Sequence, residues 1–143
     1  MITLADATAT TRIGERLAAA VTGGDAIALI GDLGAGKTTL VAGLVAALGG
    51  GEAQSPTFSL VNEYAGGRLI VWHVDLYRIE DPSEIEELGL DAAAEAILLV
   101  EWPERAGEMW PDALALSLAF TQDGDRILTA EVPPSWEGRW PPR

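Results

Sequence analysis

The chain has no cysteine, and histidine and lysine each occur only once in its 143 residues. Without cysteine, disulfides, thiolate metal sites and cysteine nucleophiles are all excluded. The sequence also lacks a basic amino-terminal region followed by an apolar run, and none of its apolar stretches approaches the length that spans a bilayer. We therefore expect a cytoplasmic protein that does not associate with membranes.

Basic residues are scarce: nine lysines and arginines stand against 22 aspartates and glutamates, which gives a net charge of −13. Sequence-independent binding to DNA or RNA needs a cationic surface that displaces counterions, so we expect no tight direct binding to nucleic acid. Between residues 75 and 108 there are eleven acids and two bases, Arg78 and Arg105. Most of this acidity is typical of a solvated face; the alternative is a surface that docks a basic partner.

The single lysine stands in a motif typical of phosphate-binding loops. The pattern G-x-x-x-x-G-K-[ST] is matched by Gly31, Asp32, Leu33, Gly34, Ala35, Gly36, Lys37 and Thr38. The glycines let loop amides approach phosphate oxygens, the lysine contacts the β- and γ-phosphates, and the threonine hydroxyl binds Mg²⁺. A strand-like run at 25–30 precedes the loop and helical spacing at 37–48 follows it, as such a loop requires. The sequence therefore predicts a nucleoside triphosphate site.

Two carboxylates that end apolar runs are candidates for holding the metal ion. Asp75 follows the run 69–74, and Glu101 follows the more uniformly apolar run 96–100. Ligands lie beyond the carboxyl ends of strands in open α/β sheets, so both acids could face the phosphates. Either acid could bind the metal directly while the other orients a water molecule.

Two neighbouring residues keep alternative interpretations open. His73, two positions before Asp75, fits a packed, hydrogen-bonded strand residue, with a general base or metal ligand as the alternative. Trp102 directly follows Glu101 and either covers the site or closes the core.

The hydrophobic pattern predicts one α/β domain over residues 1–132. We expect a three-layer, P-loop nucleotidase-like mixed sheet with parallel central strands and antiparallel edge hairpins. The tail at 133–143 contains four prolines and is expected to be poorly ordered. The expected strands are 2–4, 25–30, 57–64, 68–75, 96–100, 113–120 and 126–132. Three helices are expected: the first begins after Asp6, the second spans 37–48 and the third spans 84–88.

The presence of a single lysine also narrows the class of nucleotide-binding protein. A regulatory GTPase reads guanine through N-K-x-D, which needs a second lysine. No L-S-G-G-Q-like signature of a transporter ATPase and no arginine-rich kinase lid is present. A small ATPase remains, with a small-molecule phosphotransferase and a nucleotide-gated binding module as alternatives.

Four ordered blocks resemble the TsaE (YjeE) family, the ATPase component of the bacterial machinery that makes threonylcarbamoyladenosine in tRNA. The resemblance covers about residues 6 to 104. The blocks are residues 31–39, the segment Ser55-Pro56-Thr57-Phe58, residues 73–78 (HVDLYR) and residues 101–103 (EWP).

The resemblance implies a role for each matching position. Thr38 and Glu101 would coordinate Mg²⁺, with Asp75 nearby as a second acid. The nucleotide-binding loop would extend through Thr39, and Trp102 would lie close to the nucleotide.

The resemblance also implies a switch, a base site and partners. Ser55, Pro56, Thr57 and Phe58 would form a nucleotide-sensitive segment, and the base would lie near Ala7. TsaD and TsaB would be partner subunits, and ATP hydrolysis would reset their complex between turnovers. Apart from the resemblance, Arg78 and Arg105 are internal candidates for stabilising transition-state charge, but surface salt bridging is the favoured interpretation for each.

Overall fold

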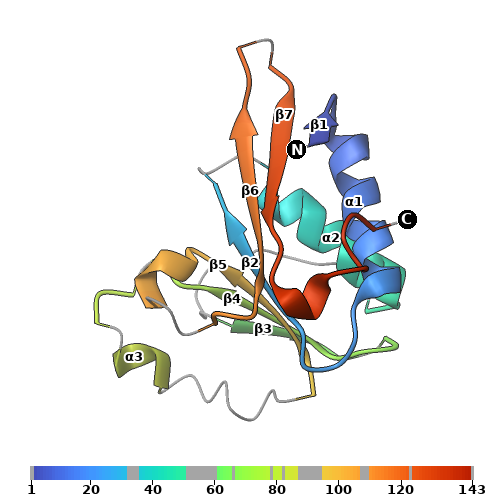
Figure 1. Ribbon diagram of the computed structural model, residues 1–143. Coiled ribbons are helices and arrows are strands. Elements are labelled where there is room, and N and C mark those ends of the chain that lie inside the picture. Colours follow the sequence, from blue (N-terminus) through green and yellow to red (C-terminus); the bar gives the residue numbers. More distant parts are fainter. Residues whose placement is uncertain are drawn as a thin grey trace.

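The protein is described by a computed structural model that covers residues 2–31, 36–50, 61–65, 67–77, 79–81, 83–86, 95–106, 110–122 and 124–142. In these segments seven strands form one sheet, in the order β1-β7-β6-β2-β5-β4-β3 (Figure 1). The strands are β1 (Ile2–Leu4), β2 (Ala26–Ile30), β3 (Val61–Tyr64), β4 (Val71–Asp75), β5 (Ile97–Glu101), β6 (Leu114–Phe120) and β7 (Arg126–Glu131). The helices are α1 (Ala7–Ala20), α2 (Lys37–Leu48) and α3 (Ser83–Glu86), with 3₁₀ turns at Pro103–Ala106 and Pro134–Trp136.

The centre of the sheet is parallel and its edges are antiparallel. β2 pairs in parallel with β5 and β6, and β5 pairs in parallel with β4. β3 is antiparallel to β4, β7 to β6, and β1 to β7. The prediction of an α/β fold with parallel central strands and antiparallel edge hairpins is therefore confirmed. Residues 57–60 of the strand expected at 57–64 lie outside the described segments.

Strand β5 is covered on both faces of the sheet, which explains why its residues 97–100 are all apolar and do not alternate with polar ones. Ile97 and Leu99 belong to the core on the side of α1 and α2, whereas Leu98 and Val100 belong to a second apolar cluster. All five residues of the strand are buried, because apolar groups cover both faces of the sheet there.

The two long helices begin and end at residues suited to those positions. Asp6 caps α1, since its Oδ1 accepts a hydrogen bond of 2.9 Å from the backbone N–H of Ala9. Helix α2 spans the residues predicted for it and ends at Gly49, whose φ of 88° favours glycine. Within the described residues, no helix combines the length and the apolar character needed to cross a membrane.

Helices α1 and α2 approach each other closely enough to require glycine. A Cβ at Gly14 would lie 2.2 Å from the carbonyl oxygen of Leu40, and one at Gly43 would lie 2.4 Å from that of Thr11. Each distance is well inside van der Waals contact, so the two backbones touch directly at these positions. The contact fixes the position of α2, and therefore of Lys37 at its first residue, relative to α1.

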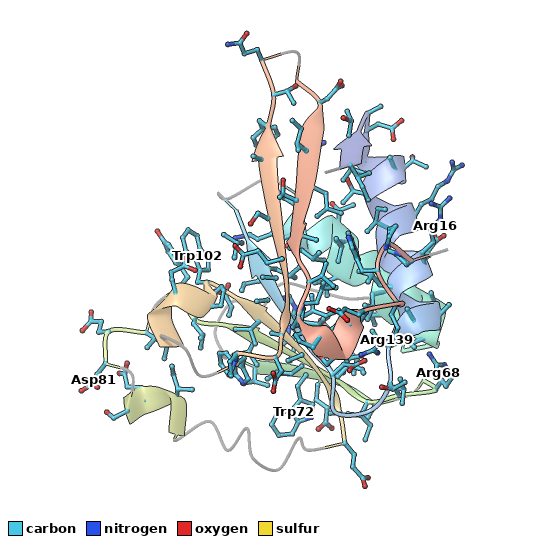
Figure 2. The ribbon with its side chains drawn as sticks, viewed as in Figure 1. Arg16, Arg68, Trp72, Asp81, Trp102 and Arg139 are labelled. Atoms are coloured by element: carbon cyan, nitrogen blue, oxygen red, sulfur yellow. The ribbon has the colours of Figure 1, made fainter. Side chains whose placement is uncertain are left out.

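The C-terminal segment differs from the expectation of poor order. Trp136 is fully buried in the main core, and Arg139 lies over its ring with its guanidinium carbon 4.0 Å from the ring centroid. Both terminal nitrogens of Arg139, labelled in Figure 2, bond to the carboxylate of Asp25 at 2.6 and 3.1 Å. The prolines end regular structure, but an apolar anchor and an ion pair hold the segment against the domain.

Candidate functional site

The phosphate-binding motif lies between the end of β2 and the start of α2. Gly36 directly precedes the helix with a φ of 110°, a left-handed conformation that side chains with a Cβ rarely adopt. The first turn of α2 therefore directs backbone N–H groups toward the carboxyl edge of the sheet, where an anion binds favourably. Asp32, Leu33, Gly34 and Ala35, predicted to complete this loop, lie outside the described residues.

Lys37 is buried, with 4% of its surface exposed, and its ammonium faces three electron-rich groups. Nζ donates a hydrogen bond of 2.6 Å to the carbonyl oxygen of Gly31. It also lies 3.8 Å from Glu101 Oε1 and 4.5 Å from the ring centroid of Trp102. Such surroundings compensate a buried positive charge, which would otherwise be costly to remove from water.

Glu101 is the last residue of the central strand β5, and it is 5% exposed. Its two carboxylate oxygens have different neighbours: Oε1 faces Lys37, and Oε2 lies 2.6 Å from His73 Nε2. His73 is fully buried in β4. The histidine is thus packed within its strand, and it also contacts the acid that the sequence pointed to as a metal ligand.

Asp75 lies beside Glu101 at the same edge of the sheet. The two residues are register partners in the parallel pair of β4 and β5. Asp75 Oδ1 accepts a hydrogen bond of 2.9 Å from the backbone N–H of Tyr77, so this carboxylate also supports the turn after β4. The position is compatible with the site role predicted for Asp75 and with a structural role in this turn.

Trp102 adopts an uncommon backbone conformation, with a φ of 58°. Its indole ring lies beside the Lys37 ammonium and 4.9 Å, centroid to centroid, from the ring of Tyr77 (Trp102 is labelled in Figure 2). A left-handed tryptophan costs about 1–3 kcal/mol, which the surrounding contacts must offset. Trp102 also packs against the second apolar cluster, so its position is compatible with both interpretations, covering the site and closing the core.

The donor atoms in this region fit Mg²⁺ shared with phosphate groups. Thr38 lies in the first turn of α2, and Glu101 and Asp75 supply carboxylates from adjacent strands. Mg²⁺ in nucleotide sites is typically held by one or two protein oxygens together with phosphates and water. Among the described residues there is no group of three or more acids, histidines or cysteines that could hold a metal ion.

Arg126 is a residue near the motif that the sequence did not single out. Its Cδ and Nε would lie 3.4 Å from a Cβ placed on Gly36, and Thr10 of α1 lies on the same side at 3.5 Å. The Arg126 guanidinium carbon is 5.1 Å from the centroid of the Phe120 ring. No local pattern singles out this arginine at the start of β7, because its approach to Gly36 depends on how the β6–β7 hairpin packs.

For the other residues expected in the site, the structure gives only a position in a helix, or the residues lie outside the described part of the chain. Ala7 is the first residue of α1, and Thr39 is partly buried in α2. The switch segment Ser55, Pro56, Thr57 and Phe58, the residue Arg78 and the side chain of Arg105 lie outside the described part of the chain.

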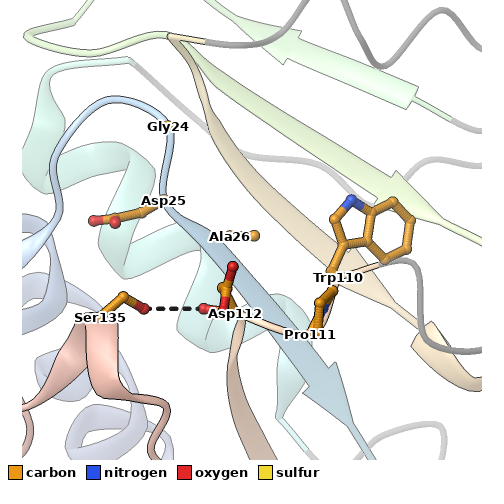
Figure 3. Close-up of a pocket in the computed structure, with 7 residues that line it drawn as sticks. All are labelled: Gly24, Asp25, Ala26, Trp110, Pro111, Asp112 and Ser135. Carbon is orange, nitrogen blue, oxygen red and sulfur yellow. Dashed lines mark hydrogen bonds between the residues drawn. The ribbon is translucent and has the colours of Figure 1, made fainter.

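A pocket of about 260 Å³ lies at the opposite edge of the sheet (Figure 3). Its residues precede or begin β2, precede β6, or belong to the C-terminal segment, whereas Lys37 lies beyond the carboxyl end of β2. The Asp25 carboxylate beside it is already paired with Arg139, and Ser135 Oγ donates a hydrogen bond of 3.2 Å to the Asp112 carbonyl. The pocket is therefore separate from the site around Lys37. It is lined by Gly24, Asp25, Ala26, Trp110, Pro111, Asp112 and Ser135.

Comparison with known families gives one match that covers most of the chain. The family model described as "Threonylcarbamoyl adenosine biosynthesis protein TsaE" matches residues 4–128. This range includes Lys37, His73, Asp75 and Glu101.

Similar proteins carry the same description. Two of them, each named tRNA threonylcarbamoyladenosine biosynthesis protein TsaE, come from Nostoc sp. and Bacillus subtilis. The Nostoc protein is 41% identical over 140 residues, which cover 93% of this chain and 85% of that protein. The Bacillus subtilis protein is 40% identical over 124 residues, or 84% of this chain and 77% of that protein. A crystal structure of Bacillus subtilis YdiB matches with a TM-score of 0.78 and 31% identity, covering 96% of this chain and 88% of that one.

Proposed function

The chain belongs to the TsaE family, and from this premise we propose that it is an Mg²⁺-dependent ATPase subunit required for threonylcarbamoyladenosine modification of tRNA. The observation that supports the proposed ATPase activity is the ion pair between Lys37 and Glu101. Their charged atoms lie 3.8 Å apart in a buried position, directly beside the start of α2. A lysine of the phosphate loop and an acid at the end of a neighbouring strand are the groups that a P-loop ATPase uses for a metal-bound triphosphate.

Each residue has a proposed role that follows from its chemistry. Lys37 places a positive charge on the β- and γ-phosphates, while N–H groups at the start of α2 bind phosphate oxygens. Thr38 and Glu101 hold Mg²⁺, which neutralises charge on the phosphates when it is bound. Asp75, one strand away, orients the attacking water, and the Trp102 ring limits access of bulk water to the phosphates.

We further propose that the protein acts on partner subunits, TsaB and TsaD, and not directly on tRNA. A net charge of −13 opposes binding to a polyanion and favours contact with a basic protein surface. Exposed acids near α3, among them Glu80, Asp81 and Glu84, are available for such a contact. The switch residues 55–58 would report the nucleotide state to the partners, and hydrolysis would reset the complex between turnovers.

The decisive experiment measures Mg·ATP hydrolysis by the isolated chain, then with TsaB–TsaD, and then with tRNA added. We expect slow hydrolysis alone and clear stimulation by the partners, because lid and loop closure often require the full assembly. Phosphate transfer to an added small-molecule acceptor would identify a phosphotransferase instead. Nucleotide-dependent assembly with no hydrolysis, even in the complete mixture, would identify a nucleotide-gated binding module.

A further inference from the structure

We propose that His73 is a positioning residue for Glu101: its Nε2–H holds one carboxylate oxygen, so that the other points toward Lys37 and the start of α2. This inference rests on the proposed function, because it concerns the acid that would hold Mg²⁺. The sequence alone left His73 as a packed strand residue or a direct participant. The contacts assign it a third role, in which it acts through Glu101.

The geometry divides the two oxygens of the carboxylate between two elements. Oε2 lies 2.6 Å from His73 Nε2, and Oε1 lies 3.8 Å from Lys37 Nζ. His73 is fully buried, and Glu101 is 5% exposed. A hydrogen bond to a carboxylate in such a shielded position is short and strong, and water competes with it little.

The surroundings of His73 Nδ1 indicate which of the two imidazole nitrogens carries the proton. His73 Nδ1 is buried and has no hydrogen-bond partner among the described residues. A proton on Nδ1 would leave an N–H group buried without an acceptor, whereas a proton on Nε2 is shared with Glu101 Oε2. The contacts therefore place the proton on Nε2, where the imidazole donates to the carboxylate.

The sheet register makes this arrangement rigid. His73 is the register partner of Leu99, and Asp75 is the register partner of Glu101, so His73 reaches Glu101 diagonally across β4 and β5. Both strands belong to the parallel centre of the sheet. If His73 could not donate, Glu101 Oε2 would lose this donor, and the carboxylate would be free to rotate out of the orientation that directs Oε1 toward the start of α2.

The sole histidine makes a direct test of the bond practical. The full-length, tag-free chain is labelled with ¹⁵N-histidine, and its long-range ¹H–¹⁵N spectrum is recorded with and without Glu101→Gln. We expect the proton on Nε2 with a strongly downfield shift, and an upfield movement of that proton when the carboxylate becomes a weaker amide acceptor. A proton on Nδ1, or an Nε2–H signal that Glu101→Gln leaves unchanged, would overturn the proposal.

A second test asks whether the bond matters for the metal. Binding of a fluorescent ATP analogue is titrated with Mg²⁺ in the wild type, His73→Leu and His73→Gln. Losing a residue that orients a metal ligand typically weakens metal affinity by about ten- to a hundredfold, so we expect a loss of that size in His73→Leu. His73→Gln keeps an N–H donor near the position of Nε2 and should recover most of the affinity. Metal-free nucleotide binding should change by less than about twofold, because Glu101 does not bind the phosphates directly.

Val74→Ala is the matched control, because Val74 is the next residue of the same strand, is fully buried, and packs in the apolar cluster on the other face of the sheet. It removes packing without touching Glu101 and should leave Mg²⁺ affinity unchanged. Wild-type Mg²⁺ dependence in His73→Leu, or equal losses in all three variants, would refute the positioning role. If the wild type binds no nucleotide with Mg²⁺, the proposed function fails, and the spectrum still decides whether His73 holds Glu101.

Discussion

Lys37 Nζ and Glu101 Oε1 lie 3.8 Å apart, with 4% and 6% of the respective side chains exposed. Charges this well shielded are costly to leave alone, so each depends on the other and on its remaining contacts. Among the described residues, Lys37 also contacts the Gly31 carbonyl and the Trp102 ring, and Glu101 also contacts His73. A ligand that draws one of the two charges away must therefore also satisfy the other, as Mg²⁺ bound to a triphosphate would do.

Replacing Lys37 with methionine should weaken binding of ATP by about ten- to a hundredfold, because a hydrogen bond to a charged group contributes about 1.5–3 kcal/mol. Methionine keeps much of the apolar stem, and no other lysine in the chain can substitute. Isothermal titration calorimetry measures the effect. Arg12→Ala, at an exposed position of α1, removes the same unit of charge away from the motif and serves as the control. Wild-type ATP affinity in Lys37→Met would disprove the site assignment.

Two amide substitutions separate the roles of the neighbouring acids. Glu101→Gln should reduce Mg²⁺-dependent hydrolysis and Mg²⁺ affinity, while metal-free nucleotide binding stays near the wild-type level. Asp75→Asn should reduce turnover by about tenfold or more through loss of a water-orienting carboxylate, with nucleotide affinity retained. The asparagine oxygen can still accept the Tyr77 N–H bond, so the turn after β4 should survive. Single-turnover hydrolysis and circular dichroism check both points, and unchanged turnover in Asp75→Asn would leave Glu101 as the only functional acid.

Trp102 should report nucleotide binding through its fluorescence. Its ring contacts the Lys37 ammonium, so moving that ammonium onto phosphates changes the surroundings of the indole. We expect ATP to change the emission of the wild type, and we expect most of that change to disappear in Trp102→Phe. Trp72→Phe serves as the control, because the Trp72 indole instead donates a 2.8 Å hydrogen bond to Glu63. An equal ATP response in Trp102→Phe and the wild type would show that the nucleotide does not affect this contact.

The C-terminal segment should contribute measurably to stability. Trp136→Ala is expected to lower the free energy of unfolding by about 3–5 kcal/mol, since it empties a fully buried aromatic position. Val132→Ala, at a position with 39% exposure, should change stability by less than about 0.5 kcal/mol. Urea denaturation monitored by circular dichroism distinguishes the two variants. Equal midpoints would mean that residues 133–142 do not stabilise the folded domain.

The parts of the fold that local chemistry determines could be predicted from the sequence. Three such features depend on residues close together in the chain: the helix cap at Asp6, helix α2 between Gly36 and Gly49, and the apolar run 97–100 of β5. The packed tail could not be predicted, because prolines indicate irregular backbone and the burial of Trp136 depends on distant partners.

The same limit applies to the candidate site. The motif around Lys37 and the acids at the strand ends were visible as local patterns. The contact between His73 and Glu101 joins residues 28 positions apart and depends on the register of two strands. The approach of Arg126 to Gly36 likewise depends on the packing of a hairpin, for which the local sequence carries no signal.

The glycine contacts between α1 and α2 fix the distance between the first residues of the two helices, and this distance bears on which ligands can bind across them. Ala7 begins α1, Lys37 begins α2, and the helices touch backbone to backbone through Gly14 and Gly43. Neither helix can slide past the other without a steric clash. If the base binds near Ala7 and the phosphates bind near Lys37, the distance between the two ends of the ligand is set by a rigid pair of helices. The protein would then select ligands in which the base and the phosphates are separated by this fixed distance.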